Sequence, residues 1–124
     1  MAANTDLTNP HALMSAFSDR FNAHDLDGLV ALYEPEAAFA PRPGVTVTGH
    51  DAIRAALAEF LALRPTISAV VAEVLSGGDV ALVLNDWDLT GTAADGTELR
   101  QQGRSSDVVR RQPDGRWLVV VDKP

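Results

Sequence analysis

Two aspartates near the ends of an apolar C-terminal hairpin are the residues best suited to chemistry. In "RSSDVVRRQPDGRWLVVVDKP", which closes the chain, Asp107 lies near the start of the first predicted strand and Asp122 near the end of the second. A carboxyl group that faces an apolar interior keeps its proton at neutral pH and can donate a hydrogen bond. Two such carboxyls in one dry pocket share a proton, which gives one acid and one base. The alternative is that both are solvated strand ends.

The turn between the two strands decides whether both aspartates face the same side. If Asp114 and Gly115 form a two-residue turn, Asp107 and Asp122 stand opposite each other on one face. If Pro-Asp-Gly at 113–115 forms a type I turn with a glycine bulge, the register slips by one residue. Asp122 then points to the other face, unless a second bulge restores the pairing. The Pro-Asp-Gly sequence favours the slipped register locally, and both geometries remain open from these residues alone.

Further candidates lie in the strand that contains "LNDWDL" and beside the second helix. Strand alternation places Val83, Asn85 and Trp87 on one face. Asn85 could orient a carbonyl or hydroxyl group, and Trp87 offers an indole N–H; the alternative is that both are ordinary core residues. Tyr33 could point its hydroxyl into a cavity, or pack its ring with the hydroxyl at the surface.

No residues suggest a metal or cofactor site. The chain has no cysteine, and His11, His24 and His50 have no metal-type spacing. All three histidines stand near helix ends and are predicted to be exposed. The glycine-rich motifs that bind phosphates are missing from the sequence. We therefore expect no cofactor and no metal.

Composition excludes several classes of function. A formal net charge of −7 argues against nucleic acid and against an anionic membrane surface. No apolar run reaches the roughly 18 residues that span a bilayer, and the N-terminus lacks the pattern of a signal peptide. With 124 residues, 46% of them hydrophobic, the chain can build one domain with a real core. The expectation is a cytoplasmic domain over 9–124, preceded by a flexible segment at 1–8.

Local signals predict three helices followed by a four-stranded antiparallel meander. Thr8 or Asn9 can cap the first helix, with Pro10 in its first turn, and Asp25 can cap the second. Pro35 is expected to end the second helix. Segregated helices and strands indicate an α+β fold. The predicted helices span 8–25, 26–34 and 50–65, two extended pieces fall within 37–49, and the strands span 67–75, 79–89, 97–111 and 116–122.

Two of these strands are apolar at consecutive positions. Apolar and polar residues do not alternate in "VALVL" at 80–84 or in "WLVVV" at 117–121. They would alternate in a sheet with one solvent-exposed face. Both faces of the sheet are therefore predicted to be covered. The helices can cover one face, and a second copy of the sheet is the simplest cover for the other. We expect a homodimer through the sheet.

Several stretches together resemble the NTF2-like superfamily, in its SnoaL-like and ketosteroid-isomerase-like branch. They are "FNAHDLDGLVALYEPEAAF", "GHDAIRAALAEFLA", "GDVALVLNDW" and "DGRWLVVVD", and the resemblance covers about residues 9 to 123. It implies an NTF2-like (cystatin-like) cone, with three N-terminal helices packed on a curved antiparallel sheet that encloses a pocket. Asp107 and Asp122 would form the polar end of this pocket, assisted by Asn85. Its walls would be formed by Phe17, Phe21, Tyr33, Phe60, Val83, Trp87 and Val109.

The steroid isomerases of this branch use a tyrosine, an aspartate base and a protonated aspartic acid. The resemblance places the tyrosine position on Phe17, the base position on Pro41 and the acid position on Asp107. Only the last carries the required group, so a true ketosteroid isomerase is not expected. The predicted function is binding of a small, largely apolar molecule, with cofactor-free acid/base chemistry of isomerase, cyclase or dehydratase type. The alternative is a non-catalytic ligand-binding or dimerisation module.

Overall fold

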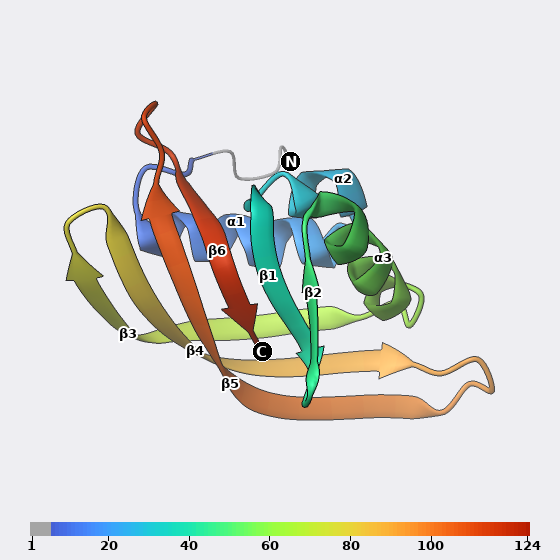
Figure 1. The fold of residues 1–124 in the computed structure, drawn as a ribbon. Helices are drawn as coiled ribbons and strands as arrows, with labels where there is room; N and C mark the ends of the chain where they lie inside the picture. Colours follow the sequence, from blue (N-terminus) through green and yellow to red (C-terminus); the bar gives the residue numbers. More distant parts are fainter. Residues whose placement is uncertain (1–5) are drawn as a thin grey trace.

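Three helices and six strands make up the part of the chain that the computed structural model describes, residues 6–124 (Figure 1). The predicted α+β class is confirmed. In chain order the elements are α1 (Pro10–Asn22), α2 (Leu26–Val30), β1 (Tyr33–Arg42), β2 (Val45–Thr48), α3 (His50–Leu61), β3 (Thr66–Gly77), β4 (Val80–Thr92), β5 (Glu98–Arg111) and β6 (Trp117–Lys123).

All six strands belong to one curved sheet in the order β2-β1-β6-β5-β4-β3. The predicted meander is present as β3 to β6, and its neighbours pair antiparallel. The two extended pieces, β1 and β2, join the same sheet beside β6. Because β1 runs parallel to β6, the sheet is mixed rather than wholly antiparallel. The helices are also not one N-terminal block, since β1 and β2 separate α3 from the other two.

Local capping signals begin the first two helices as predicted. Asn9 precedes α1 and its side-chain oxygen accepts from the amide of Ala12 at 2.8 Å, with Pro10 at the first helical position. Asp25 caps α2 in the same way, accepting from the amide of Gly28 at 2.9 Å. Both caps use side chains within three residues of their partners, so the sequence reveals them.

The end of the second helix differs from the prediction. α2 stops at Val30, and Tyr33 is the first residue of β1 rather than part of a helix. Parallel pairing with β6 decides this, because the amide of Val119 donates to the carbonyl of Leu32 at 2.8 Å. Pro35 lies within β1, in the segment where the pairing register with β6 is irregular, so its missing N–H leaves no gap in a regular ladder.

The helices cover one face of the sheet. α1 packs on β3 and β6, α3 packs on β1 and β2, and α2 lies against both helices (Figure 1). The core between them reaches further towards the N-terminus than predicted. Of the segment expected to be flexible, residues 1–5 lie outside the described residues, but Leu7 is buried and its carbonyl accepts from the amide of Trp117. No helix within residues 6–124 is long and apolar enough to cross a membrane.

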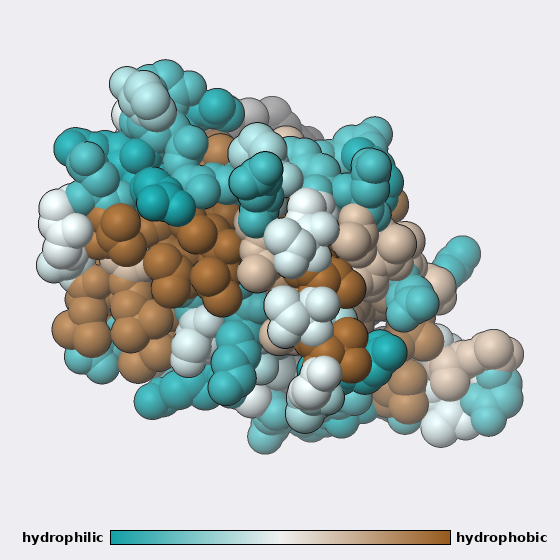
Figure 2. Space-filling model, viewed as in Figure 1, coloured by the Kyte–Doolittle hydropathy of each residue, from teal (hydrophilic) through white to brown (hydrophobic). Residues whose placement is uncertain are grey.

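The opposite face of the sheet carries an outer apolar row. Cross-strand pairing aligns Leu75, Leu82, Val108, Val121 and Ala38 across β3, β4, β5, β6 and β1. Leu75 is 53% exposed and Val121 40% exposed. Figure 2 shows a continuous hydrophobic patch on this side of the molecule, over the strands of the meander. The consecutive apolar residues of β4 and β6 therefore point to both faces of the sheet, and residues 6–124 cover only one of these faces.

Candidate functional site

The β5–β6 turn adopts the slipped geometry that its sequence favours. Gln112 and Arg116 flank the three loop residues, with the amide of Gln112 donating to the carbonyl of Arg116 at 2.7 Å. The amide of Gly115 donates back to the carbonyl of Gln112 at 2.9 Å, and Gly115 has φ +89°. Only glycine adopts this backbone readily. Next to the turn, Val109 therefore pairs with Val119.

A second irregularity then restores the pairing of the two aspartates. Val109 pairs with Val119, but the next pair is Val108 with Val121, so Val120 has no partner. Beyond this bulge Asp107 lies directly opposite Asp122. The two one-residue shifts cancel, and both carboxyls point to the helix-covered side of the sheet. Both aspartates thus face inward, as expected, and this register requires both bulges.

Asp107 is buried and its two oxygens have different surroundings. The side chain is 6% exposed. Its Oδ2 accepts from Asn85 Nδ2 at 3.0 Å and from the Ser105 hydroxyl at 3.2 Å. Among the described residues no donor forms a hydrogen bond with its Oδ1. A proton on Oδ1 would make this oxygen a donor towards Asp122, the carboxyl opposite.

Asp122 accepts a hydrogen bond from the side chain of Tyr33. The Tyr33 hydroxyl donates to Asp122 Oδ2 at 2.5 Å, between side chains that are 1% and 7% exposed. Burial, with the negative charge of Asp122 beside it, raises the pKa of Tyr33 well above its usual value, so the phenol stays neutral and acts as a donor. A charge-assisted hydrogen bond of this kind favours the ionised form of Asp122.

Both carboxyls hold a proton more readily than an ordinary aspartate does. Burial, then the charge of Asp122 and its hydrogen bond, raise the pKa of Asp107 far above the usual aspartate value. Burial also raises the pKa of Asp122, but hydrogen bonds from Asp107 and Tyr33 act in the opposite direction. Of the two adjacent carboxyls, the surroundings thus favour Asp107 as the one that keeps a proton.

These aspartates form the polar end of an otherwise apolar pocket of about 110 Å³. None of the lysines, arginines and histidines within residues 6–124 lines it. Four phenylalanines, from α1, β1 and α3, supply much of the wall. The pocket is lined by Met14, Phe17, Ser18, Phe21, Phe39, Leu57, Phe60, Ile67, Ala69, Asn85, Trp87, Leu89, Gln101, Ser105, Asp107, Val119, Asp122 and Pro124.

Most of the predicted site residues meet in this pocket, and three do not line it. Val83 and Val109 are fully buried core residues, although they lie on the inner face as alternation predicts. Tyr33 is also core, and only its hydroxyl takes part, through Asp122. The predicted residues that do line the pocket are Phe17, Phe21, Phe60, Asn85, Trp87, Asp107 and Asp122.

On β5, two of the missed lining residues had a sequence signal. Ser105 lies two residues before Asp107, so strand alternation would place it on the same face, and its hydroxyl contacts that carboxyl. Gln101, four residues earlier still, follows the same alternation. Pro124 and Ile67 reach the pocket through long-range packing, which no local pattern indicates.

A broader groove adjoins the pocket and shares Phe60, Trp87, Gln101 and Pro124 with it. The groove runs along β1 and β2 and contains Pro41, the position that the resemblance matches to the isomerase base. Pro41 therefore lies outside the pocket and has no proton to transfer. The shared residues are the boundary through which a ligand longer than the pocket would extend.

Other charged groups lie apart from the pocket. Arg104 and Arg110 form ion pairs on exposed parts of the sheet, with Asp86 and Glu34 respectively, each at 2.8 Å. The prediction that all histidines are exposed is wrong for His50, which is half-buried because its Nε2 contacts the carbonyl of Tyr33 at 2.8 Å. Within residues 6–124 no three acidic or histidine side chains gather as a metal site would require.

Residues 14–120 match the SnoaL-like domain, which is most of the chain. The chain belongs to the SnoaL-like domain family. This confirms the resemblance drawn from the sequence. The matched segment of this SnoaL-like domain includes Asp107 and ends two residues before Asp122. No curated protein matches the chain.

Solved structures share the fold of this SnoaL-like domain at low identity. A ketosteroid isomerase-like protein from Erwinia carotovora atroseptica is 19% identical with a TM-score of 0.83, over 96% of this chain and 94% of that one. An NTF2-like protein with a cystatin-like fold from Novosphingobium aromaticivorans is 20% identical with a TM-score of 0.73, over 89% and 74%. A candidate dehydratase of the NTF2-like family from Streptomyces avermitilis is 20% identical with a TM-score of 0.77, over 98% and 95%. These likenesses show the fold alone.

Proposed function

We propose that the pocket binds a small, largely apolar, uncharged molecule and that Asp107 and Asp122 perform cofactor-free acid/base chemistry on it. The observation that carries this proposal is the pairing of two buried carboxyls, directly opposite on β5 and β6, at the polar end of an apolar pocket. Burying two carboxyls costs stability, and such a cost is typical of functional sites.

The surroundings of each carboxyl assign its role. Asp107 is the carboxyl whose surroundings favour protonation, so it is the acid that protonates or hydrogen-bonds a ligand oxygen. Asp122 is the ionised base that accepts a proton from the ligand, and Tyr33 orients it. One proton is given and one is taken, so the pair ends with the same net charge. This balance suits isomerisation, cyclisation or dehydration, in which the ligand loses and gains protons at different atoms.

Steroid isomerisation is not part of the proposal. Phe17 lines the pocket without a hydroxyl, and Pro41 lies in the adjoining groove. Neither residue can replace the tyrosine or the base of the steroid isomerases. The acid and base of this chain both come from the terminal hairpin instead.

A second candidate function is a non-catalytic ligand-binding or dimerisation module. The observation that favours it is the outer apolar row, whose members Leu75 and Val121 are 53% and 40% exposed. A second copy of the sheet, packed on this row, would remove these side chains from water and form a homodimer. Dimerisation is compatible with acid/base chemistry, so the aspartates decide between the two functions.

Carboxyl-carbon NMR titration of Asp107 and Asp122 tests the proposal. We expect neither carboxyl to titrate with the ordinary value of about 3.9. Asp107 should remain protonated at neutral pH, and its Asp122 neighbour should shift when Asp107 is replaced by Asn. The exposed Asp86 gives the matched reference signal, since its pKa is lowered by the hydrogen bond from Arg104. Two ordinary titrations would leave the non-catalytic module as the better function.

A further inference from the structure

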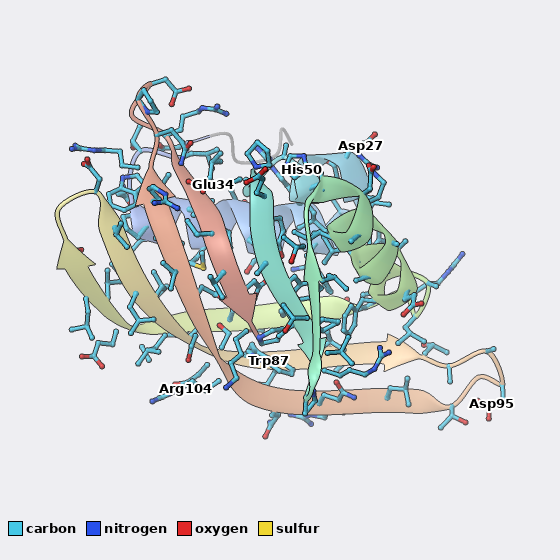
Figure 3. All side chains as sticks on the ribbon, in the orientation of Figure 1. Asp27, Glu34, His50, Trp87, Asp95 and Arg104 are labelled. Carbon is cyan, nitrogen blue, oxygen red and sulfur yellow. The ribbon has the colours of Figure 1, made fainter. Side chains whose placement is uncertain are left out.

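Three cationic side chains, Arg42, Arg64 and Lys123, form no ion pair or side-chain hydrogen bond within residues 6–124. All ten lysines and arginines of the chain lie in this part of it. Six of them form ion pairs with carboxylates, and Arg20 donates to a backbone carbonyl. Arg104, labelled in Figure 3, is one of the six. The unpaired three are therefore the cations left to bind an external anion.

Two of these three cations line the same groove. Arg42 and Lys123 belong to the lining of the groove that adjoins the pocket, whereas Arg64 does not. Among the lining residues Glu59 is the acidic side chain, so the cations outnumber it. The chain as a whole has a net charge of −7. An anion is therefore repelled by most of the surface and attracted to this groove.

The sheet brings the two cations to the same edge. β1 ends at Arg42 and β6 ends at Lys123, and because the strands are parallel neighbours these ends lie at the same side of the sheet (Figure 1). Phe39 lies opposite Asp122, so continuing this register by one residue places Lys123 beside Ala40. Arg42 stands two residues further, roughly 7 Å along the strand. Both side chains are long and flexible enough to contact one anionic group between them.

The turn that carries Arg42 is rigid. Arg42 stands between Pro41 and Pro43, and Gly44 follows with φ +79°. Each proline ring fixes its own φ, and Pro43 also restricts the backbone of Arg42. A backbone that is ordered before binding loses less entropy when a ligand arrives. The planar guanidinium group also matches two oxygens of a carboxylate or phosphate.

The rest of the groove is largely apolar. Its wall includes Ala40, Pro41, Pro43, Val45, Leu63 and Val121. Trp87, labelled in Figure 3, lines both the groove and the pocket. The groove has a volume of about 1060 Å³, against about 110 Å³ for the pocket, so it has room for a ligand of its own.

We propose that the groove is a second binding site, which takes an amphiphilic anion with its carboxylate or phosphate group on Arg42 and Lys123. The apolar part of the anion lies along the groove wall, against Pro41 and Leu63. This inference goes beyond the proposed function, because it does not depend on the uncharged molecule that occupies the pocket. Carboxylate and phosphate are recognised by the same cations, and matched probes distinguish them.

Small amphiphiles test the inference on the intact protein at neutral pH. Hexanoate and hexyl phosphate carry the anion, hexanol is the neutral counterpart with the same chain, and toluene is a neutral ring compound that reports on the pocket. Binding is followed by NMR through the amide signals of Gly44 and Thr46 for the groove, and of Ser18 and Ala69 for the pocket. Both anions should shift the groove signals, with and without toluene. Hexanol should bind roughly fivefold more weakly, as the loss of two exposed ion pairs implies. The tighter anion identifies the preferred head group.

Arg42→Gln and Lys123→Gln each remove one cation and keep a polar side chain. Each should weaken Kd for hexanoate roughly two- to threefold, which is the range of one exposed ion pair. Added salt should weaken binding to the wild-type protein. Arg64→Gln is the matched control and should bind as wild type does, because Arg64 is an unpaired cation outside the groove. If all three variants weaken binding equally, or if hexanol binds as tightly as hexanoate, the anion site is refuted.

The remaining outcomes separate this site from the dimer and from the pocket. Ala38 and Val121 belong both to the groove and to the outer apolar row. If affinity for hexanoate falls as rising protein concentration produces dimers, the groove is an interface between copies, which overturns the inference. Hexanoate that shifts only the pocket signals also overturns it. Toluene binding without anion binding overturns this inference alone, whereas anion binding with ordinary titrations of Asp107 and Asp122 overturns the proposed function alone.

Discussion

Replacing Asp107 by Asn tests the shared proton through the stability of the fold. The amide has nearly the shape of a protonated carboxyl. Its oxygen can accept from Asn85 and Ser105 as Oδ2 does, and its nitrogen can donate towards Asp122. The variant therefore resembles the protonated state but has no proton to lose. Any difference between the proteins that grows with pH reports the titration of Asp107.

The direction and size of this stability difference follow from the linkage between protonation of Asp107 and folding. The pKa of Asp107 is raised in the folded state, above all by burial and next by the charge of Asp122. A group of this kind contributes stability that is fully present below its unfolded pKa and is lost as pH rises towards its folded pKa. Above about pH 4 the unfolded chain releases this proton while the folded chain retains it, which lowers the free energy of unfolding by roughly 1.4 kcal/mol per pH unit. Between pH 4 and pH 7 the loss reaches about 4 kcal/mol, a large share of the 5–15 kcal/mol typical of a domain.

Urea unfolding of wild type and Asp107→Asn across mildly acidic to neutral pH is the assay. We expect similar stabilities near pH 4 and an advantage for the variant that widens by roughly 1.4 kcal/mol per unit, to about 4 kcal/mol at pH 7. Asp86→Asn is the control, because Asp86 is exposed and its pKa is lowered by the hydrogen bond from Arg104; its curve should lack this widening. If the free energies of unfolding of wild type and Asp107→Asn change in parallel with pH, Asp107 ionises normally in the folded protein. That result would refute the shared proton.

Three further predictions concern the groups around the pair. Tyr33→Phe removes the 2.5 Å hydrogen bond to Asp122, so the pKa of Asp122 should rise in a carboxyl-carbon titration. The free energy of unfolding should fall by roughly 1.5–3 kcal/mol. An unchanged titration of Asp122 would contradict the role of Tyr33. Gly103→Ala places a Cβ 2.7 Å from the Trp87 ring, so tryptophan fluorescence should shift and affinity for ring compounds should fall, while circular dichroism stays unchanged. Val121→Glu puts a charge in the outer apolar row, so light scattering should show a wild-type dimer reduced to a monomer of 13.2 kDa. A wild-type protein that is already monomeric at micromolar concentration would exclude the homodimer.

Signals confined to a few residues were readable from the sequence. The caps Asn9 and Asp25 bond to amides three residues away, and both mark the start of a helix correctly. Turn residues separated the four strands of the meander, and alternation placed Val83, Asn85 and Trp87 on one face. Each of these features depends on backbone preferences within a short stretch, so long-range packing did not need to be known.

Contacts between distant segments were not readable in the same way. Tyr33 meets Asp122 across 89 positions of sequence because β1 runs parallel to β6. Helical spacing around Tyr33 suggested a helix, and pairing with Val119 overrides that preference. The role of the tyrosine thus depends on a sheet neighbour that local patterns do not identify.

The bulge at Val120 links the register of the hairpin to function. Three consecutive valines, 119–121, carry no mark of which one is unpaired. Without the bulge, continuation of the turn register would pair Asp107 with Val121 and place Asp122 opposite Ser106, on the outer face. That alternative would bury a valine and expose a carboxylate, an arrangement that burial energetics alone prefer. The structure instead exposes Val121 and buries Asp122 against Tyr33. A register that gives up apolar burial to bring a second carboxyl beside the first is expected where the pair itself is needed, and this supports the acid/base proposal over a pocket that merely results from the fold.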